Sequence, residues 1–130
     1  MINFFSKYKF IFYIINILLI FIYLFPGSIF GCILYDDCFL QPQLTPDFIV
    51  SSNHLYAFLI LSIIGFITFK NLKKFFLLNI YLIFLSILLE ILHIIIPNRS
   101  FELSDLFGNL IGVTVVIIIN SFLKNEKNES

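Results

Sequence analysis

Five polar residues in the C-terminal half of the chain have the types and spacing that binding chemistry requires. Glu90 and His93 are three residues apart, so a helix places them on one face. Asp105 and Asn109 share a face in the same way, and Arg99 lies between the two pairs. An acid, a titratable imidazole and a cation in one place can bind a polar ligand or move a proton. We predict a ligand-binding site made of these five residues and assign no catalytic role.

The same cluster has a purely structural interpretation, in which its side chains only clasp helices together. Hydrogen bonds between helices in membranes contribute about 0.6 kcal/mol per pair. Gly108 and Gly112 form a GxxxG pattern on nearly the same face as Asn109, and small residues allow two helices to approach closely. We expect this face to pack against the face of Glu90 and His93, with the arginine of the cluster neutralising one of its acids.

The Glu90-x-x-His93 unit is also the building block of carboxylate-bridged di-iron bundles. Those sites need two such units and two further glutamates. The chain contains one unit and no second. We therefore predict no metal site and no cofactor.

The only two cysteines, Cys32 and Cys38, have the spacing C-x5-C. Thiol-oxidising enzymes typically use C-x-x-C or two cysteine pairs, which this chain lacks. The pair either forms a small structural disulfide around Asp36 and Asp37 or stays reduced. These two acids, and Asp47 further on, are predicted to be solvated loop charges.

Composition restricts the class of protein. The chain has 130 residues, of which 60% are apolar and 12% charged, with eight basic and eight acidic residues. Soluble domains are about 25% charged, so this chain has too few charges to cover a soluble globule. Its apolar content excludes a disordered protein, and eight scattered cations exclude a nucleic-acid binder. An all-α integral membrane protein remains, with the lipid bilayer as its first partner.

Four apolar segments are long enough, or nearly so, to cross a bilayer as helices. We predict a bundle of four transmembrane helices in a single membrane domain, 10–123. A cytoplasmic N-terminus (1–9) precedes this domain and a polar cytoplasmic tail (124–130) follows it. The loop from Gly27 to Asn53 is not expected to form a regular span, and its apolar stretch S-I-F-G-C-I-L-Y either lies at the membrane interface or folds back onto the bundle. The predicted helices cover residues 10–25, 54–70, 75–96 and 105–123.

The lysines predict the orientation. All seven precede the first span, lie between the second and third, or follow the fourth, so they share one side. The opposite loops carry Arg99 and mostly acids. Because cytoplasmic loops are enriched in Lys and Arg, both termini are predicted to be cytoplasmic in a multi-pass protein of the cell membrane.

Three short segments follow one another in the C-terminal half of the chain. They are E-I-L-H with Glu90, P-N-R-S with Arg99, and D-L-F-G-N-L-I-G with Asp105, Asn109 and Gly112. This order resembles a motif of the VanZ-like family of membrane proteins. That motif reads roughly E-x-x-Q, then a Pro and an Arg-Ser, then D-x-x-x-N-x-x-G. All five residues match it directly.

The chain also departs from the family's pattern. His93 stands where the family usually has Gln. An earlier family motif, Asp-Lys-x-x-His-Phe, opens the second helix and is best matched by residues 53–58. There Asn53 replaces the acid, His54 the lysine and Ala57 the histidine. The resemblance covers residues 51–112 and depends mainly on the second motif.

The resemblance implies a small, multi-span protein of the bacterial inner membrane and cell envelope. The best-known member of the family is linked to low-level resistance to the glycopeptide antibiotic teicoplanin. We therefore expect the five predicted site residues to bind an anionic or amide-rich envelope component, such as an envelope lipid or a peptidoglycan-related ligand. A contribution to glycopeptide tolerance would follow.

Two other functions fit the same residues. A small proton-coupled transporter with four helices, working as a homodimer, would use Glu90 as its membrane-embedded acid. A purely structural membrane subunit would use the cluster only as a clasp. The sequence contains no nucleotide-binding loop, serine-nucleophile motif or zinc box, so it predicts no reaction.

Overall fold

The computed structural model describes residues 4–69 and 72–129, with side chains for 9–69 and 73–129. Lys70, the last residue of the second predicted helix, lies outside the described residues. So do residues 1–3 of the predicted N-terminus and Ser130 of the predicted tail. No strand occurs in the described ranges, which confirms the all-α class. In chain order the helices are α1 (Phe4–Leu24), α2 (Ile29–Tyr35), α3 (Ser52–Thr68), α4 (Leu72–Leu92) and α5 (Leu103–Glu129).

The four long helices lie on the four predicted apolar segments, but their ends differ. The prediction of helix up to residue 96 was wrong, because α4 ends at Leu92 and tight turns follow, such as His93 N–H to Glu90 C=O at 3.2 Å. Pro97 disfavours helical conformation in the residue before it. Beyond residue 123, α5 continues through most of the predicted tail because Lys, Glu and Asn without Gly or Pro tolerate a helix.

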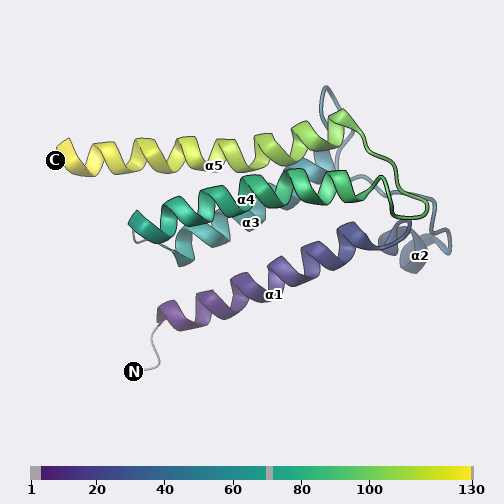
Figure 1. Cartoon of the computed structure of the whole chain (residues 1–130), viewed down its shortest axis with the longest axis horizontal. Coiled ribbons are helices and arrows are strands. Elements are labelled where there is room, and N and C mark those ends of the chain that lie inside the picture. The colour runs from purple at the N-terminus through teal and green to yellow at the C-terminus, as the bar shows by residue number, and fades with distance from the viewer. Residues whose placement is uncertain (1–3, 70–71, 130) are drawn as a thin grey trace.

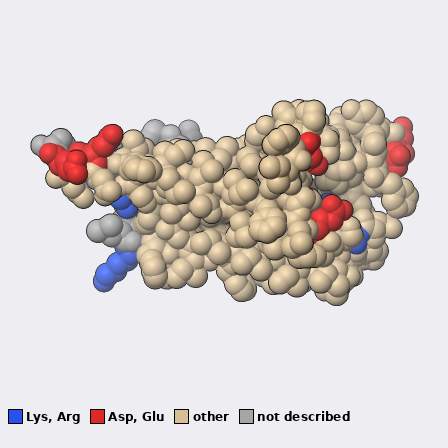
Figure 2. All heavy atoms as spheres, turned by 90° about the horizontal axis from the view of Figure 1, so that it is seen from above, with Lys and Arg blue, Asp and Glu red and all other residues tan. Residues whose placement is uncertain are grey.

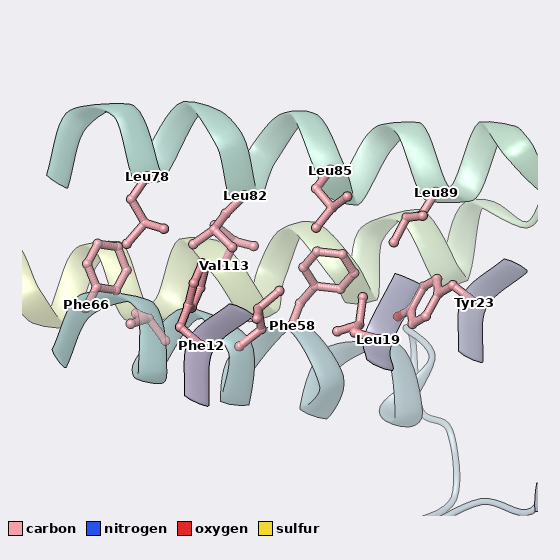
Figure 3. Packing of buried hydrophobic residues seen from close by; sticks show 12 residues of the cluster. Phe12, Leu19, Tyr23, Phe58, Phe66, Leu78, Leu82, Leu85, Leu89 and Val113 are labelled. Atoms are coloured by element: carbon pink, nitrogen blue, oxygen red, sulfur yellow. The ribbon is translucent and has the colours of Figure 1, made fainter. Parts of the chain in front are cut away.

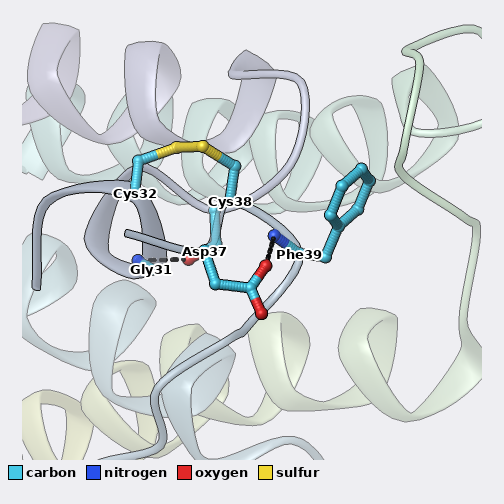
Figure 4. The surroundings of a disulfide bond; sticks show 6 residues. Gly31, Cys32, Asp37, Cys38 and Phe39 are labelled. Atoms are coloured by element: carbon cyan, nitrogen blue, oxygen red, sulfur yellow. Dashed lines mark hydrogen bonds between the residues drawn. A yellow bond between two sulfur atoms is a disulfide. The ribbon is translucent and has the colours of Figure 1, made fainter. Parts of the chain in front are cut away.

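The loop between the first two predicted spans contains the short helix α2. This helix is bent by 82° from α1 across the Pro26-Gly27 break. Ser28 caps it by accepting a hydrogen bond from the Gly31 backbone N–H at 3.0 Å. Cys32 and Cys38 form a disulfide that holds the returning chain against the helix (Figure 4). The structural alternative for the cysteine pair is therefore the one observed.

A band of apolar side chains from all four long helices forms the core. Leu78, Leu82, Leu85 and Leu89 lie at helical spacing along one face of α4 and point toward the other helices (Figure 3). Partners include Phe58 and Phe66 of α3, Phe12 and Tyr23 of α1 and Val113 of α5. Most other large apolar side chains on these helices are exposed, as expected for helices that contact lipid.

The long helices run side by side, so the start of α1 and the end of α5 lie at one end of the molecule (Figure 1). The disulfide loop and the α4–α5 connection lie at the other end. In the face seen in Figure 2, charged side chains gather toward the two ends and leave the length between them uncharged.

Among the described residues, α4 (from Lys73) and α5 are long and apolar enough to cross a membrane. The bent pair α1–α2 would raise the number to three if it counts as one span. Helix α3 is apolar but shorter. The chain therefore has the properties of a membrane protein with at least two helices able to span a bilayer.

Candidate functional site

The fold brings four of the five predicted site residues together inside the end of the bundle that carries the disulfide loop. Glu90, His93 and Asn109 are almost fully buried, and the side chain of Asp105 is 19% exposed. Glu90 lies on the last turn of α4, and Asp105 lies on the first turn of α5. We call the set of these four residues together with His54 the polar cluster.

Asn109 is the hydrogen-bonding centre of the polar cluster. Its Oδ1 accepts from the Tyr23 hydroxyl at 2.8 Å and lies 3.1 Å from His54 Nδ1. Its Nδ2 donates to the Ser86 backbone carbonyl at 3.2 Å. One amide therefore connects α1, α3 and α4 to α5.

His54, which the sequence analysis considered only as the replacement for the lysine of the family's earlier motif, lies in the middle of the polar cluster. It is 6% exposed, and its Nε2 lies 3.4 Å from Asp105 Oδ2. Its Nδ1 lies 3.9 Å from Glu90 Oε2. The imidazole thus contacts both acids.

Glu90 and His93 contact each other, as their shared face on the helix predicted. Glu90 Oε1 accepts from the Glu102 backbone N–H at 3.0 Å, and Oε2 lies 3.3 Å from His93 Nδ1. That second contact lacks hydrogen-bond geometry, so Oε2 is a buried acceptor without a partner in the described part of the chain. His93 Nε2 lies 3.0 Å from the Tyr23 carbonyl oxygen.

Tyr23 is the second residue that the sequence analysis missed. Its ring centroid lies 4.9 Å from that of His54, and it stacks on His93 at 5.9 Å. It comes from α1, far away in the sequence. The only available signal was the helical register that puts Phe12, Leu19 and Tyr23 on one buried face of α1.

The glycine pair packs against a different helix from the one predicted. A Cβ at Gly108 would lie 2.7 Å from the Ser51 carbonyl oxygen, and one at Gly112 would lie 2.6 Å from that of Leu55. Both neighbours belong to or precede α3, so the prediction that the glycines pack against α4 was wrong, although Asn109 on the same face does reach α4 through the Ser86 carbonyl. The small residues let α5 approach α3 closely, and Asn109 between them reaches the other helices.

Arg99 does not neutralise an acid, contrary to the expectation. Its guanidinium donates to the carbonyl oxygens of Ile22 and Phe25, both at 3.2 Å, and to Gln41 Oε1 at 3.4 Å. No ion pair found among the described residues includes it. Partial burial lowers the pKa of this guanidinium below its ordinary value, an effect that Asp105 opposes. The side chain therefore holds the end of α1.

Arg99 also lines a cavity of about 450 Å³ between α1, α3 and the disulfide loop. Apolar residues such as Leu18, Ile22 and Ile60 form most of its wall. Polar groups occur in the wall at Arg99 and on the loop at Gln41, and His54 of the polar cluster also contributes. An apolar chamber with a cation in its wall can hold an amphiphile with an anionic head.

Two of the three predicted loop charges, Asp37 and Asp47, also accept backbone hydrogen bonds. Asp37 Oδ1 accepts from the Phe39 backbone N–H at 2.9 Å (Figure 4). Asp47 Oδ1 accepts from the Ser52 backbone N–H at 2.8 Å at the start of α3. Asp47 is thus a helix-capping residue as well as a loop charge. Ser51, the residue at the N-cap position, makes no capping bond with its side chain.

His54, Glu90 and Asp105 each offer a ligand atom, and these atoms lie within 4.8 Å of one another. The absence of a metal site was predicted from the Glu90-x-x-His93 unit alone. Folding adds an imidazole from α3 and a carboxylate from α5 to that unit. The resulting donor set is the kind that divalent transition metals prefer.

Comparison with known proteins identifies no relative: no protein family, curated protein or solved structure matches the chain.

Proposed function

We propose that the chain is a multi-pass protein of the cell-envelope membrane, similar to the VanZ-like family, that binds an anionic envelope lipid in the cavity beside Arg99. The main support for this proposal is that Arg99 lines an apolar cavity and has no carboxylate partner among the described residues. An acyl or polyprenyl chain would occupy the apolar part of the cavity. The headgroup would accept hydrogen bonds from the guanidinium.

Four spans and cytoplasmic termini are part of this proposal. The start of α1 and the end of α5 lie at the same end, which an even number of crossings requires (Figure 1). Lys73 and Lys74 begin α4, and Lys124 and Lys127 lie on the last turns of α5, at that same end. The positive-inside rule would place it in the cytoplasm. The disulfide lies at the opposite end, where an oxidising compartment would maintain it.

The disulfide provides a test of the orientation. In intact cells, a membrane-impermeant phosphine followed by an impermeant maleimide is expected to label two thiols per chain, counted by mass spectrometry. A variant with Cys32→Ser and Cys38→Ser controls for other reactive groups and should take up none. Labelling only after the membrane is permeabilised would place the loop in the cytoplasm and contradict the proposed orientation.

Lipid binding is tested by filling the cavity. Ala57 lines it from α3, so Ala57→Trp is expected to weaken binding of phosphatidylglycerol at least about tenfold, or ~1.4 kcal/mol. Native mass spectrometry of the full-length protein measures the bound lipid. Ile63→Trp is the matched control, because Ile63 is 42% exposed on α3 and does not line the cavity.

Arg99→Gln tests the choice of headgroup separately from the cavity. We expect it to abolish the preference for phosphatidylglycerol over zwitterionic phosphatidylethanolamine, and Arg99→Lys to retain that preference. Equal binding of both lipids by the wild type, or equal binding by Ala57→Trp and Ile63→Trp, would refute the proposal. In a strain lacking the gene, only variants that bind the lipid should restore glycopeptide tolerance.

A further inference from the structure

We propose that the polar cluster is a binding site for one divalent transition-metal ion, Zn²⁺, held by His54, Glu90, His93 and Asp105. This inference does not depend on the lipid cavity. It follows from which ring nitrogens of the two histidines carry hydrogen. It also follows from the hydrogen bonds that the second nitrogen or oxygen of each ligand makes.

The hydrogen of His93 is assigned by its backbone contact. Nε2 lies 3.0 Å from the Tyr23 carbonyl oxygen, which can only accept, so Nε2 carries the hydrogen. In a neutral imidazole Nδ1 then presents a lone pair. That nitrogen lies 3.3 Å from Glu90 Oε2, so two acceptors lie close together in a buried site.

The same reasoning applies to His54. Asn109 Nδ2 donates to the Ser86 carbonyl, so the atom facing His54 Nδ1 at 3.1 Å is the amide oxygen. Nδ1 of His54 must therefore be the donor, and Nε2 presents its lone pair. Nε2 lies 3.4 Å from Asp105 Oδ2, a second close contact between two acceptors.

Glu90 supplies an independent sign of a missing partner. Its side chain is fully buried, and Oε1 is occupied by the Glu102 backbone N–H. Oε2 points into the cluster and has no hydrogen-bond partner in the described ranges. A buried carboxylate oxygen without a donor is strongly disfavoured, whereas a cation would satisfy it.

One divalent cation would satisfy both imidazole lone pairs and both carboxylates at once. Zn²⁺ binds nitrogen and carboxylate oxygen at about 2.0–2.2 Å, which puts neighbouring ligand atoms roughly 3.3–3.6 Å apart in a tetrahedron. The 3.3 Å and 3.4 Å contacts have this separation. Ligand atoms of His54, Glu90 and Asp105 all lie within 4.8 Å of one another, and His93 joins them through its 3.3 Å contact with Glu90 Oε2.

The surroundings also have the pattern found around metal ligands. A ligating histidine usually donates its other N–H to a carbonyl oxygen or carboxylate, which fixes the ring. His93 donates to the Tyr23 carbonyl, and His54 donates to the Asn109 amide oxygen. The ion would join α3, the end of α4 and the start of α5 inside the end of the bundle that carries the disulfide loop. Asp105, the most exposed ligand, would be on the side of entry.

Metal binding is tested with the full-length protein in detergent micelles, purified with a tag that contains no histidine and stripped with a chelator. Competition with a chromophoric chelator is expected to show one Zn²⁺ per chain. His54→Gln and His93→Gln should each weaken Zn²⁺ binding at least about a hundredfold, since even changes to the groups that hydrogen-bond the ligands cost about 10–100-fold. Glu102→Gln is the matched control and should bind as the wild type does, because only the Glu102 backbone contacts the cluster.

A second measurement needs only the wild type, so it is independent of whether the variants fold. Replacing Zn²⁺ by Co²⁺ should produce the visible absorption of a tetrahedral nitrogen and oxygen site. Substoichiometric Zn²⁺ binding by the wild type would overturn the proposal and indicate that two protons fill the acceptor contacts instead. Equal loss of binding in Glu102→Gln and His54→Gln would overturn it as well.

Discussion

Replacing Gly112 by valine is expected to lower the free energy of unfolding by about 3 kcal/mol, the upper part of the range for overpacking a well-packed interior. A Cβ at this position would lie 2.6 Å from the Leu55 carbonyl oxygen and 2.9 Å from the Leu59 backbone nitrogen. Both atoms belong to the backbone of α3, so no side chain can rotate away. The whole of α5 would have to move from α3, and Asn109 would lose its partners. Reversible unfolding in mixed detergent micelles, followed by circular dichroism, measures the change.

The matched control is Val115→Leu, which adds bulk to the same helix on its 38% exposed face. It should change the stability by less than about 0.5 kcal/mol, as surface substitutions typically do. If Gly112→Val proves as stable as Val115→Leu, α5 does not pack against α3 at the observed distance. The glycine-mediated contact would then be wrong.

Asn109→Leu is expected to destabilise the protein by about 3 kcal/mol, although leucine has nearly the same size. The change leaves the Tyr23 hydroxyl and His54 Nδ1–H without partners in a buried site, and it removes the second hydrogen bond of the Ser86 carbonyl, which lies inside α4. Each orphaned group costs about 1–3 kcal/mol, and small rearrangements recover part of that cost. The same unfolding experiment measures the effect.

Tyr23→Phe separates the contribution of one bond from the rest. It removes only the 2.8 Å hydrogen bond to Asn109 and should cost about 1 kcal/mol. The double variant Asn109→Leu with Tyr23→Phe should lose less unfolding free energy than the two single variants lose in sum, because the Asn109–Tyr23 bond is lost only once. Strict additivity would show that the two side chains do not interact and would contradict the arrangement of the polar cluster.

Local sequence patterns determine much of this fold. Long apolar runs predict four helices because a helix satisfies its own backbone hydrogen bonds where no water is available. Helical periodicity also explains why Glu90 and His93 share one face, and Asp105 and Asn109 another. The spacing of the cysteines allowed a disulfide but did not distinguish it from a reduced pair. The two sulfurs meet only because the chain reverses after α2, where Asp36 has a positive φ and the Asp37 N–H donates to the Gly31 carbonyl.

Packing between helices was decided by the tertiary structure. Asn109 is joined by hydrogen bonds to His54 and Tyr23, which precede it in the sequence by 55 and 86 positions. Periodicity along one helix carries no information about such distant partners. The sequence therefore placed His54 only in the family's earlier motif, and its partners Asp105 and Asn109 follow from the packing of α3 against α5. Arg99 was expected beside an acid because opposite charges attract. In the folded chain it donates to the free carbonyl groups at the end of α1, which need donors in a dry environment.

The sequence by itself determined the class of the protein, its helical segments and the four acidic, amide and imidazole residues contributed by α4 and α5. Those features depend on neighbours within a few turns of one helix. The tertiary structure alone decided that His54 and Tyr23 complete the cluster, that the glycines contact α3 and that the acceptors face one another. These depend on which helix faces meet, and the apolar faces of these helices are too similar in composition to specify a partner on their own.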